Sequence, residues 1–553
     1  MGETPTVTET ADLAPNPATG ATHLRSVVVR WAPLAIAIGF FIAFSIAVLS
    51  RPEKMIEPDP YAYRASIVAL QDGNLTLTQE QYDALSSRLQ QTELGGGIAQ
   101  WRTRSDGMWV SEKNPGYPFL AVGFDAAKAI RLAPLLYGAL AALGLWLGGR
   151  RWTRRTDDSP GRHRSSDWGG TFAVGAYFSC ALAMVMAWRS TMPTFTDASL
   201  IACGLGLLVW AALSFERSHR VRTIVGALGF LSIGLAFFVR YTNIVVLAIA
   251  ALAALWICLR RRWGLGWSTL VWWAIASIPP VVAALAYNAV VFDGPFSTGY
   301  RSTDVQFSVG AIPDNLSIMP RRLLQAMPIW VLGVVAIAVL VGVQVAASMA
   351  ARRNRVTTAT GPPDATAVDA TVGDGPPSRA AIDRWVGALL ISTWGALWLL
   401  YAAYEWTVRM GGGAPGGSAG GPAERMGMAQ PVYSTVRFYL PALGAIALLV
   451  AWLFARLPAA IGLVVLVVLF GFGVHEFVGT TNSQWARMTM GGAGPGMGAG
   501  PDAGGGPRTG PGTGPGDGTD GNRGGPPGRV PGERGSGGQP PTGAPPDGAA
   551  RPN

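Results

Sequence analysis

The chain alternates between long apolar runs and short polar connections. Read with a window of about twenty residues, the length that crosses a bilayer as a helix, it shows spans at 31–49, 132–149, 168–188, 198–215, 223–238, 242–259, 267–291, 328–350, 385–404, 438–454 and 459–475. The run at 223–238 is short, and 118–130 fits a re-entrant or interfacial helix, so we expect eleven spans to within about two. The pattern predicts an all-α polytopic membrane protein whose large first extracytoplasmic loop carries short interfacial helices.

Composition narrows the class further. The 553 residues are 49% hydrophobic and only 14% charged, which excludes an ordinary soluble domain. The formal net charge of +10 comes largely from arginines in short loops beside the apolar runs, a topology signal rather than a nucleic-acid surface. We therefore expect a lipid bilayer and no nucleic acid as partner. The three cysteines fall inside apolar runs and are expected to be core residues: Cys180, Cys203 and Cys258.

Arginine clusters occupy alternate loops, at 150–155, 217–222, 260–262 and 352–355. The positive-inside rule makes those loops cytoplasmic, together with the N-terminus. The first run has no convincing cleavage site after it and is expected to be a retained helix. These patterns predict a multi-pass protein of the cell (plasma) membrane, with the functional residues and the C-terminal tail on the extracytoplasmic face.

The expected organisation has three parts. Residues 1–29 form a disordered cytoplasmic N-terminus, 30–477 the transmembrane body, and 478–553 a disordered extracytoplasmic tail rich in glycine and proline. The body contains a first extracytoplasmic loop at 51–117, a low-complexity cytoplasmic loop at 351–384 and a Gly/Met-rich extracytoplasmic loop at 409–434.

Two carboxylates stand at the predicted outer face. Asp59 lies between two prolines, just before a segment with helical spacing at 61–70, and Asp197 lies at the start of the fourth span. Each also fits a helix N-cap, and the two roles are compatible because a cap fixes a carboxylate rigidly above the bundle. Acid/base or metal-assisted transfer commonly uses paired carboxylates, so both are candidate catalytic residues.

Three cations are expected at the same face. Lys113 opens the segment 113–118 at the end of the first loop, and Arg240 and Arg437 stand at outer helix ends. Interfacial anchoring is the simple alternative for each of them. Arginine can grip a phosphate bidentately and lysine can act as a point charge, so three cations on one rim suit a lipid phosphate.

In order and sidedness, these elements resemble the polytopic GT-C glycosyltransferases, the group that contains the protein O-mannosyltransferases and the aminoarabinose transferases acting on lipid A. The resemblance covers roughly residues 31–475. In that group the first outer loop begins with an acidic residue near a tyrosine and ends in a Lys/His-Pro-Pro-x-Tyr-Pro-like segment, similar to Asp59 with Tyr61 and to 113–118 here. Asn114 and Gly116 depart from the commonest form. No Asp-Glu pair stands at Asp59, which weakens the likeness to protein mannosylation.

The later motifs of the group also have counterparts. A second acidic residue before the fourth span, an arginine near the sixth and a late Arg-Tyr-x-x-Pro-like motif are similar to Asp197, to Arg240, and to Arg437 with Tyr439 and Pro441.

The resemblance implies inverting transfer of a hexosyl or pentosyl group from a polyprenyl-phosphate donor to an acceptor hydroxyl on a glycan, lipid or protein. Asp59 would be the base, Asp197 would assist or position the acceptor, and the three cations would hold the leaving phosphate. Tyrosines beside these residues are expected to bind substrate: Tyr61, Tyr63, Tyr117, Tyr241 and Tyr439. Some relatives use a divalent metal, Mg²⁺ or Mn²⁺, but two acidic residues do not demand one and no cofactor is required.

Two other classes of function stay open at this point. A multi-span transporter suits the number of spans, but it predicts ionisable residues near mid-membrane, and few are present in the apolar runs. A noncatalytic envelope-assembly scaffold would use the Gly/Pro-rich tail and the surface loops.

Overall fold

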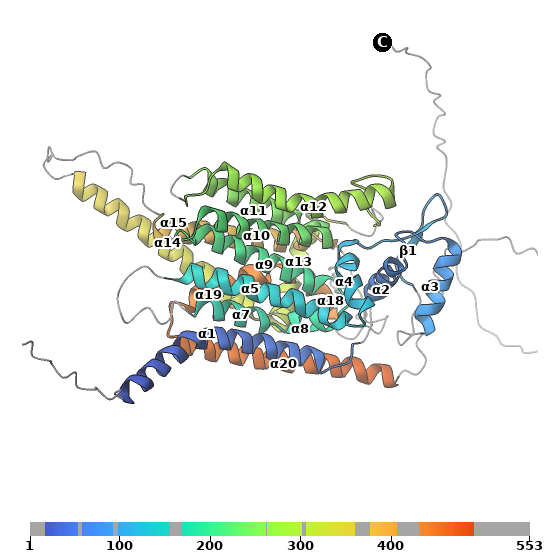
Figure 1. Ribbon diagram of the computed structural model, residues 1–553, viewed down its shortest axis with the longest axis horizontal. Coiled ribbons are helices and arrows are strands. Elements are labelled where there is room, and N and C mark those ends of the chain that lie inside the picture. Colours follow the sequence, from blue (N-terminus) through green and yellow to red (C-terminus); the bar gives the residue numbers. More distant parts are fainter. Residues whose placement is uncertain are drawn as a thin grey trace, which may run out of the picture. The chain divides into compact units, whose positions relative to one another are not determined.

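The computed structural model describes residues 17–53, 58–91, 98–154, 168–260, 263–300, 306–359, 377–405 and 431–490. Most of them are helical (Figure 1). The long helices are α1 (Pro17–Leu49), α5 (Ala133–Thr153), α9 (Thr194–Leu213), α10 (His219–Val239), α11 (Ile244–Cys258), α12 (Trp267–Phe292), α14 (Ile329–Ala359), α15 (Arg379–Ala402), α19 (Leu443–Phe454) and α20 (Ala459–Met490). The shorter ones are α2 (Pro58–Gln71), α3 (Gln79–Gln91), α4 (Gly116–Ala126), α7 (Gly169–Phe178), α8 (Ala181–Trp188), α13 (Ala311–Ala326) and α18 (Pro431–Val436). Three 3₁₀ turns complete the helical elements: η1 (Ile130–Leu132), η2 (Tyr241–Asn243) and η4 (Arg437–Ala442).

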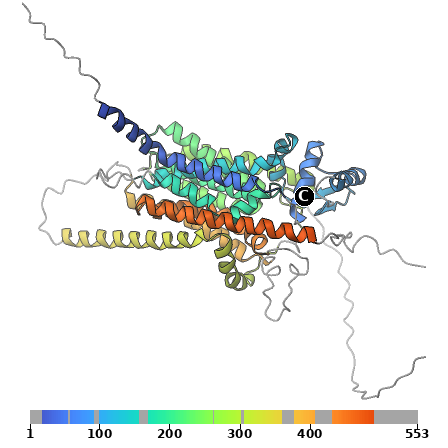
Figure 2. The same ribbon diagram turned by 90° about the horizontal axis from the view of Figure 1, so that it is seen from below.

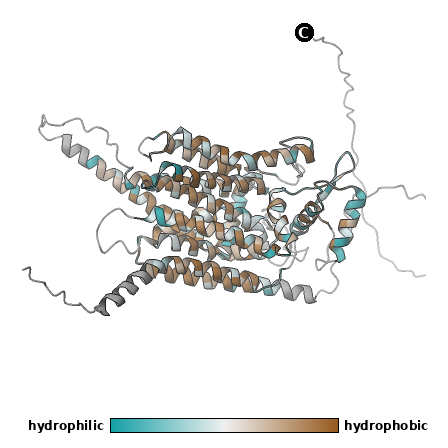
Figure 3. Ribbon diagram, in the orientation of Figure 1, coloured by the Kyte–Doolittle hydropathy of each residue, from teal (hydrophilic) through white to brown (hydrophobic). Residues whose placement is uncertain are grey.

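The membrane-spanning character predicted from the sequence is confirmed. Among the described residues, 10 helical segments are long and apolar enough to cross a bilayer, or up to 11 if α7 and α8 form one bent span. Each expected span overlaps one of them, and the short run at 223–238 belongs to a longer candidate span, His219–Val239. Figure 3 shows the apolar residues distributed along these helices and hydrophilic residues concentrated in α3. The chain is an all-α polytopic membrane protein.

Helix α9 lies at the centre of the bundle. Every residue of α9 except Trp210 is buried, and the helix packs against α5, α10 and α19. Helices α1 and α20 lie further out and touch through Phe40 and Phe470, whose ring centroids are 5.8 Å apart. Their outward side chains, such as Ile46 and Val468, are exposed, as expected where lipid covers a bundle.

The expected span 168–188 is not one straight helix. Its two halves, α7 and α8, meet at an angle of 61°. At the break, the Ser179 hydroxyl donates to the backbone carbonyls of Gly175 (2.6 Å) and Leu466 (3.2 Å). Both Ser179 and Cys180 are buried. The Ser179 hydroxyl at the break is thus satisfied by protein, and breaks in helices at membrane depth are tolerated where they are buried in protein.

Polar elements of the first loop gather at one end of the bundle. Helices α2, α3 and α4 lie there in both views (Figure 1, Figure 2), together with an antiparallel hairpin of β1 (Trp101–Thr103) and β2 (Trp109–Ser111). In the hairpin Trp101 pairs with Ser111, and Arg104 donates to the carbonyl of Val291 at the end of α12 (2.8 Å). The loop is therefore a folded cover tied to the spanning helices.

Several expected segment boundaries differ from the structure. Helix α1 begins at Pro17 inside 1–29, α14 ends at Ala359 and α15 begins at Arg379 inside 351–384, and α20 continues to Met490 beyond 477. Hydropathy detects only the part of a helix that crosses the lipid. The helix itself can continue into water where its residues have a high helix propensity. The central parts of the loops at 351–384 and 409–434 lie outside the described residues. The chain divides into units Met1–Gly492 and Ala493–Asn553, and the second unit also lies outside them.

A buried carboxylate ties helices together at the opposite end of the bundle. Asp383, near the start of α15, accepts hydrogen bonds from the indole N–H groups of Trp152 (2.9 Å) and Trp452 (3.1 Å). It also pairs with Arg379 (2.9 Å) and Arg456 (3.4 Å). Because α5, α15 and α19 meet at this one acid, it fixes how their arginine-rich ends pack.

Replacing Asp383 with alanine is therefore expected to destabilise the protein. The change leaves two buried indole donors and two guanidinium groups without their acceptor, and removing one partner of a buried ion pair costs about 3–5 kcal/mol. Thermal unfolding in detergent checks this, with Glu216→Ala as the control, since Glu216 pairs with Arg151 at the surface and its loss costs less than about 1 kcal/mol. Equal melting temperatures in the two variants would contradict the clamp role of Asp383.

Candidate functional site

Asp59 binds two cations at once. The Lys113 Nζ donates to its Oδ1 at 2.9 Å and the Arg437 Nη2 donates to its Oδ2 at 2.7 Å. The side chains of Lys113 and Arg437 are almost fully buried, with 7% and 8% exposed, whereas Asp59 keeps 18%. A third donor, the Gln100 side chain, also hydrogen-bonds this carboxylate. Residues from three distant segments therefore converge on one acid.

The segment that carries Lys113 is held by close backbone packing. A side chain at Gly116 would collide with the backbone of Phe238 at the end of α10, so only glycine allows this approach. The Asn114 side-chain amide donates to the carbonyl of Val239 (3.4 Å). Asn114 and Gly116, the two positions where the motif departs from its commonest form, thus hold the Lys113 segment against the end of α10. Arg240 follows directly after this helix.

Asp197 forms a second ion pair inside the bundle. Its Oδ2 lies 3.6 Å from the Arg240 Nε, and its Oδ1 accepts from the Asn243 side-chain amide. Asp197 is fully buried. Arg240 is further held by the Thr194 hydroxyl oxygen (3.2 Å) and by Tyr401.

The two ion pairs are neighbours. The guanidinium groups of Arg240 and Arg437 lie over the same Phe438 ring, at 5.5 and 5.0 Å from its centroid, within cation–π range. The charges of Asp59, Arg240 and Arg437 all act on the pKa of Tyr63. Two carboxylates face three cations in this cluster, leaving one positive charge in excess, which favours an anionic ligand.

The electrostatics keep Asp59 ionised. Burial alone would raise the pKa of its carboxyl group, but Lys113 and Arg437 outweigh burial and hold that pKa well below its usual range. Burial likewise lowers the pKa of Lys113, yet Asp59 reverses this and the net shift is upward. Burial raises the pKa of Tyr63 well above its usual value, so its phenol stays neutral. In this state Asp59 is a weak base because its two oxygens are occupied by cations.

The helix-cap alternatives differ from what the structure shows. Helix α2 begins at Pro58 and the N-cap of α9 is Pro193, so Asp59 and Asp197 each lie inside a first turn rather than before it. Their carboxylates pair with side chains of other segments. As first-turn acids they still interact favourably with the helix dipole.

The predicted tyrosines have different surroundings. Tyr63 lies among the charged groups, and Tyr61 on the same helix is half-buried. Tyr117 is fully buried and donates to the carbonyl of Ser190, a structural role. Tyr241 donates to Asn288 of α12 (2.8 Å). Tyr439 is buried against Trp398, and its hydroxyl has no hydrogen-bond partner in the part of the chain that the structure describes.

Three polar residues of this region escaped the sequence analysis. Gln100 has a left-handed backbone (φ 55°), a conformation that is costly outside glycine and concentrates at functional sites. Tyr300 lies under the Lys113 ammonium, with 5.3 Å between the ring centroid and Nζ. Its loop can come this close because Gly299 has no side chain, which would otherwise collide with the Glu112 backbone. Glu53 accepts from Ser190 and Thr191, and burial raises the pKa of its carboxyl group.

The described residues around Asp59 and Asp197 do not form a metal centre. Within the ranges that the structure describes, no group of three or more His, Cys, Asp or Glu side chains is placed to hold an ion. Both oxygens of Asp59 face cations, and Asp197 is shared by Arg240 and Asn243. Such a donor set fits an anion, so no step is assigned to a metal here.

A small crevice lies beside the cluster. It touches Lys113, Trp101 and Tyr287 and has a volume of about 20 Å³, room for about one water molecule. A substrate-sized anion does not fit this crevice, and both oxygens of Asp59 are occupied by Lys113 and Arg437.

Comparison with protein-family models, with curated proteins and with solved structures finds no match to this chain.

Proposed function

We propose that the chain is a membrane glycosyltransferase of GT-C type that moves a sugar from a polyprenyl-phosphate donor to an acceptor hydroxyl with inversion. The observation that supports this is the placement of Asp59 between Lys113 and Arg437 at one end of a polytopic bundle. A carboxylate for the acceptor proton and two cations for a leaving phosphate are the groups that such a transfer needs.

In the proposed reaction, Asp59 takes the proton from the acceptor hydroxyl as that oxygen forms a bond to the anomeric carbon. The bond between the anomeric carbon and the phosphate oxygen breaks on the opposite face of the sugar. The polyprenyl phosphate leaves with the electron pair, and Lys113, Arg437 and Arg240 stabilise its charge. Protonated Asp59 then releases its proton to water.

Donor binding and base activation are coupled in this scheme. The donor phosphate competes with Asp59 for Lys113 and Arg437, since the same donor atoms can serve either anion. When the cations turn to the phosphate, the pKa of Asp59 rises from its lowered value and the carboxylate becomes a stronger base. The ion pairs would thus keep the base inactive until the donor is present.

Asp197 has a supporting role in this scheme. It was expected to assist catalysis or to contact the acceptor, but its side chain is fully buried and bound to Arg240 and Asn243. We assign it as a positioning residue that fixes Arg240.

The alternatives receive less support. A transporter with a broken helix requires the break to line a path, whereas the break between α7 and α8 is buried and hydrogen-bonded to protein. A scaffold acting through the tail would lose its function on deletion of residues 491–553, while the transferase proposed here would keep its activity.

Asp59→Asn is expected to reduce sugar transfer from polyprenyl-phosphate donors in vesicles by about a hundredfold to ten-thousandfold, because general-base assistance is lost. Asp72→Asn is the matched control, since Asp72 forms an exposed ion pair with Arg88 at the same end. The double variant Asp59→Asn with Lys113→Met restores the local charge balance and should fold yet stay inactive. Full transfer by Asp59→Asn would remove the carboxylate from the mechanism.

Arg437→Gln is expected to move the acidic limb of the pH profile of kcat/KM to higher pH. Arg437 lowers the pKa of Asp59, and activity requires the deprotonated acid, so loss of that charge raises the pKa and activity is lost sooner as pH falls. Rates measured from about pH 3, below the ordinary Asp pKa of about 3.9, up to about pH 8 check this against Arg88→Gln. An unchanged acidic limb would mean that Asp59 is not the group that titrates.

A further inference from the structure

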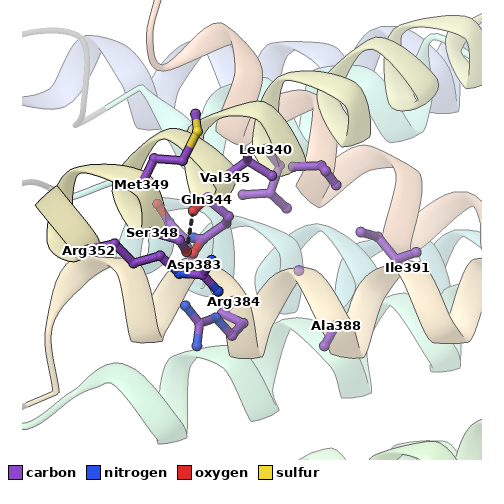
Figure 4. Close-up of a pocket in the computed structure, with 12 residues that line it drawn as sticks. Leu340, Gln344, Val345, Ser348, Met349, Arg352, Asp383, Arg384, Ala388 and Ile391 are labelled. Carbon is purple, nitrogen blue, oxygen red and sulfur yellow. Dashed lines mark hydrogen bonds between the residues drawn. The ribbon is translucent and has the colours of Figure 1, made fainter.

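A cavity of about 600 Å³ lies between α14 and α15, at the end of the bundle opposite Asp59 (Figure 4). Asp383 lines it, whereas Tyr401 at the other end of α15 contacts Arg240. With a rise of about 1.5 Å per residue, the two α15 positions are separated by about 27 Å. The cavity is therefore distinct from the proposed transfer site, and its volume lies within the range of ligand pockets, about 300–1,000 Å³.

One half of the cavity is apolar and open to the lipid side. Leu340, Val341, Val345 and Ile391 line it. The side chains of Val341 and Val345 are 51% and 50% exposed, on a helix that is long and apolar enough to span a bilayer. A hydrocarbon chain from the surrounding leaflet can enter here without crossing protein.

The other half of the cavity is positively charged. Arg352 and Arg384 line it, both are exposed, and neither makes an ion pair with any residue in the described part of the chain. The acid in the wall, Asp383, is already neutralised by Arg379 and Arg456. Two guanidinium groups on facing helices, with no ion pair to any described residue, fit a phosphate, which arginine binds through charge-assisted hydrogen bonds.

A buried acceptor lies between the two halves. The Gln344 side-chain amide donates to the carbonyl of Ala380 (3.1 Å), but its Oε1 is buried and has no hydrogen-bond partner among the described residues. The neighbouring Ser348 hydroxyl donates to the backbone carbonyl of Gln344 (2.8 Å) and not to the side-chain Oε1 (Figure 4). An unpaired buried acceptor is costly, and a hydroxyl from a ligand would satisfy it.

We propose that this cavity binds an anionic phospholipid with a hydroxyl-bearing headgroup, taken from the leaflet at this end of the bundle. The phosphate lies between Arg352 and Arg384, a headgroup hydroxyl donates to Gln344, and an acyl chain fills the apolar half. A zwitterionic lipid brings its own cation to the two arginines, so an anionic lipid fits better. Basic pockets between spanning helices bind such headgroups in other membrane proteins.

Binding is measured on the intact purified chain in a neutral detergent by native mass spectrometry, with phosphatidylglycerol as the probe. Phosphatidylcholine tests the charge, phosphatidic acid tests the headgroup hydroxyls, and inorganic phosphate tests whether the acyl chains are needed. We expect phosphatidylglycerol to bind at least about tenfold more tightly than phosphatidylcholine, a difference equal to 1.4 kcal/mol. Equal binding of these two lipids overturns the proposal, and so does saturation of the site by phosphate alone.

Variants that remove arginine charges test where the lipid binds. Arg352→Gln with Arg384→Gln is expected to weaken phosphatidylglycerol binding by about tenfold or more, since charge-assisted hydrogen bonds are lost. Arg217→Gln with Arg220→Gln is the matched control, because it removes two exposed positive charges in another arginine-rich connection. An equal loss in the control variant would show a diffuse surface effect and overturn the site.

Two further variants keep the charges. Ala388→Trp fills the cavity from α15 and is expected to abolish retention of the lipid while the melting temperature in lipid-free detergent stays unchanged. Gln344→Met is expected to reduce the preference for phosphatidylglycerol over phosphatidic acid. Full binding by Ala388→Trp would place the lipid elsewhere, and an unchanged lipid preference in Gln344→Met would remove the hydroxyl contact from the proposal.

Discussion

The architecture of the polar end depends on the ion pairs of Asp59. One carboxylate joins α2, the segment before α4 and the start of η4, which are far apart in the sequence. Lys113 and Arg437 are buried, so each would be costly without this partner. The fold can bury both cations because the acid lies between them, and the first loop is fixed over the bundle as a result.

The same arrangement holds the charged groups close together but leaves no oxygen of Asp59 available as a base. The cluster holds two carboxylates, three cations and neutral Tyr63, and the oxygens of Asp59 are occupied by Lys113 and Arg437. An anion that enters the cluster competes with Asp59 for these cations, so the cations have to turn from one anion to the other. The extra positive charge of the cluster is a structural reason to expect an anion there, whichever molecule carries it. The lipid cavity between α14 and α15 depends on other residues and stands independently of this argument.

Sequence patterns predicted the spans and the common sidedness of Asp59, Lys113 and Arg437 because hydropathy and arginine placement are strong physical constraints in a bilayer. They did not predict which cation meets which acid, because no periodicity relates residues that lie in different helices. Gln100 and Tyr300 were missed because they stand in irregular segments, where a polar residue carries no signal of its partner. Asp197 was correctly placed at a helix start, but its burial against Arg240 depends on how α9 packs on α10.

The length of chain between Asp59 and Arg437 also matters while the protein is being made. The two residues are 378 positions apart, and at about 5–20 residues per second the ribosome needs roughly 20–75 s to reach the second after the first. During that interval Arg437 is not yet part of the chain, so of the three residues that hold Asp59 only Lys113 and Gln100 can be present. The contact between Arg437 and Asp59 can thus form only after every helix from α2 to α15 has been synthesised.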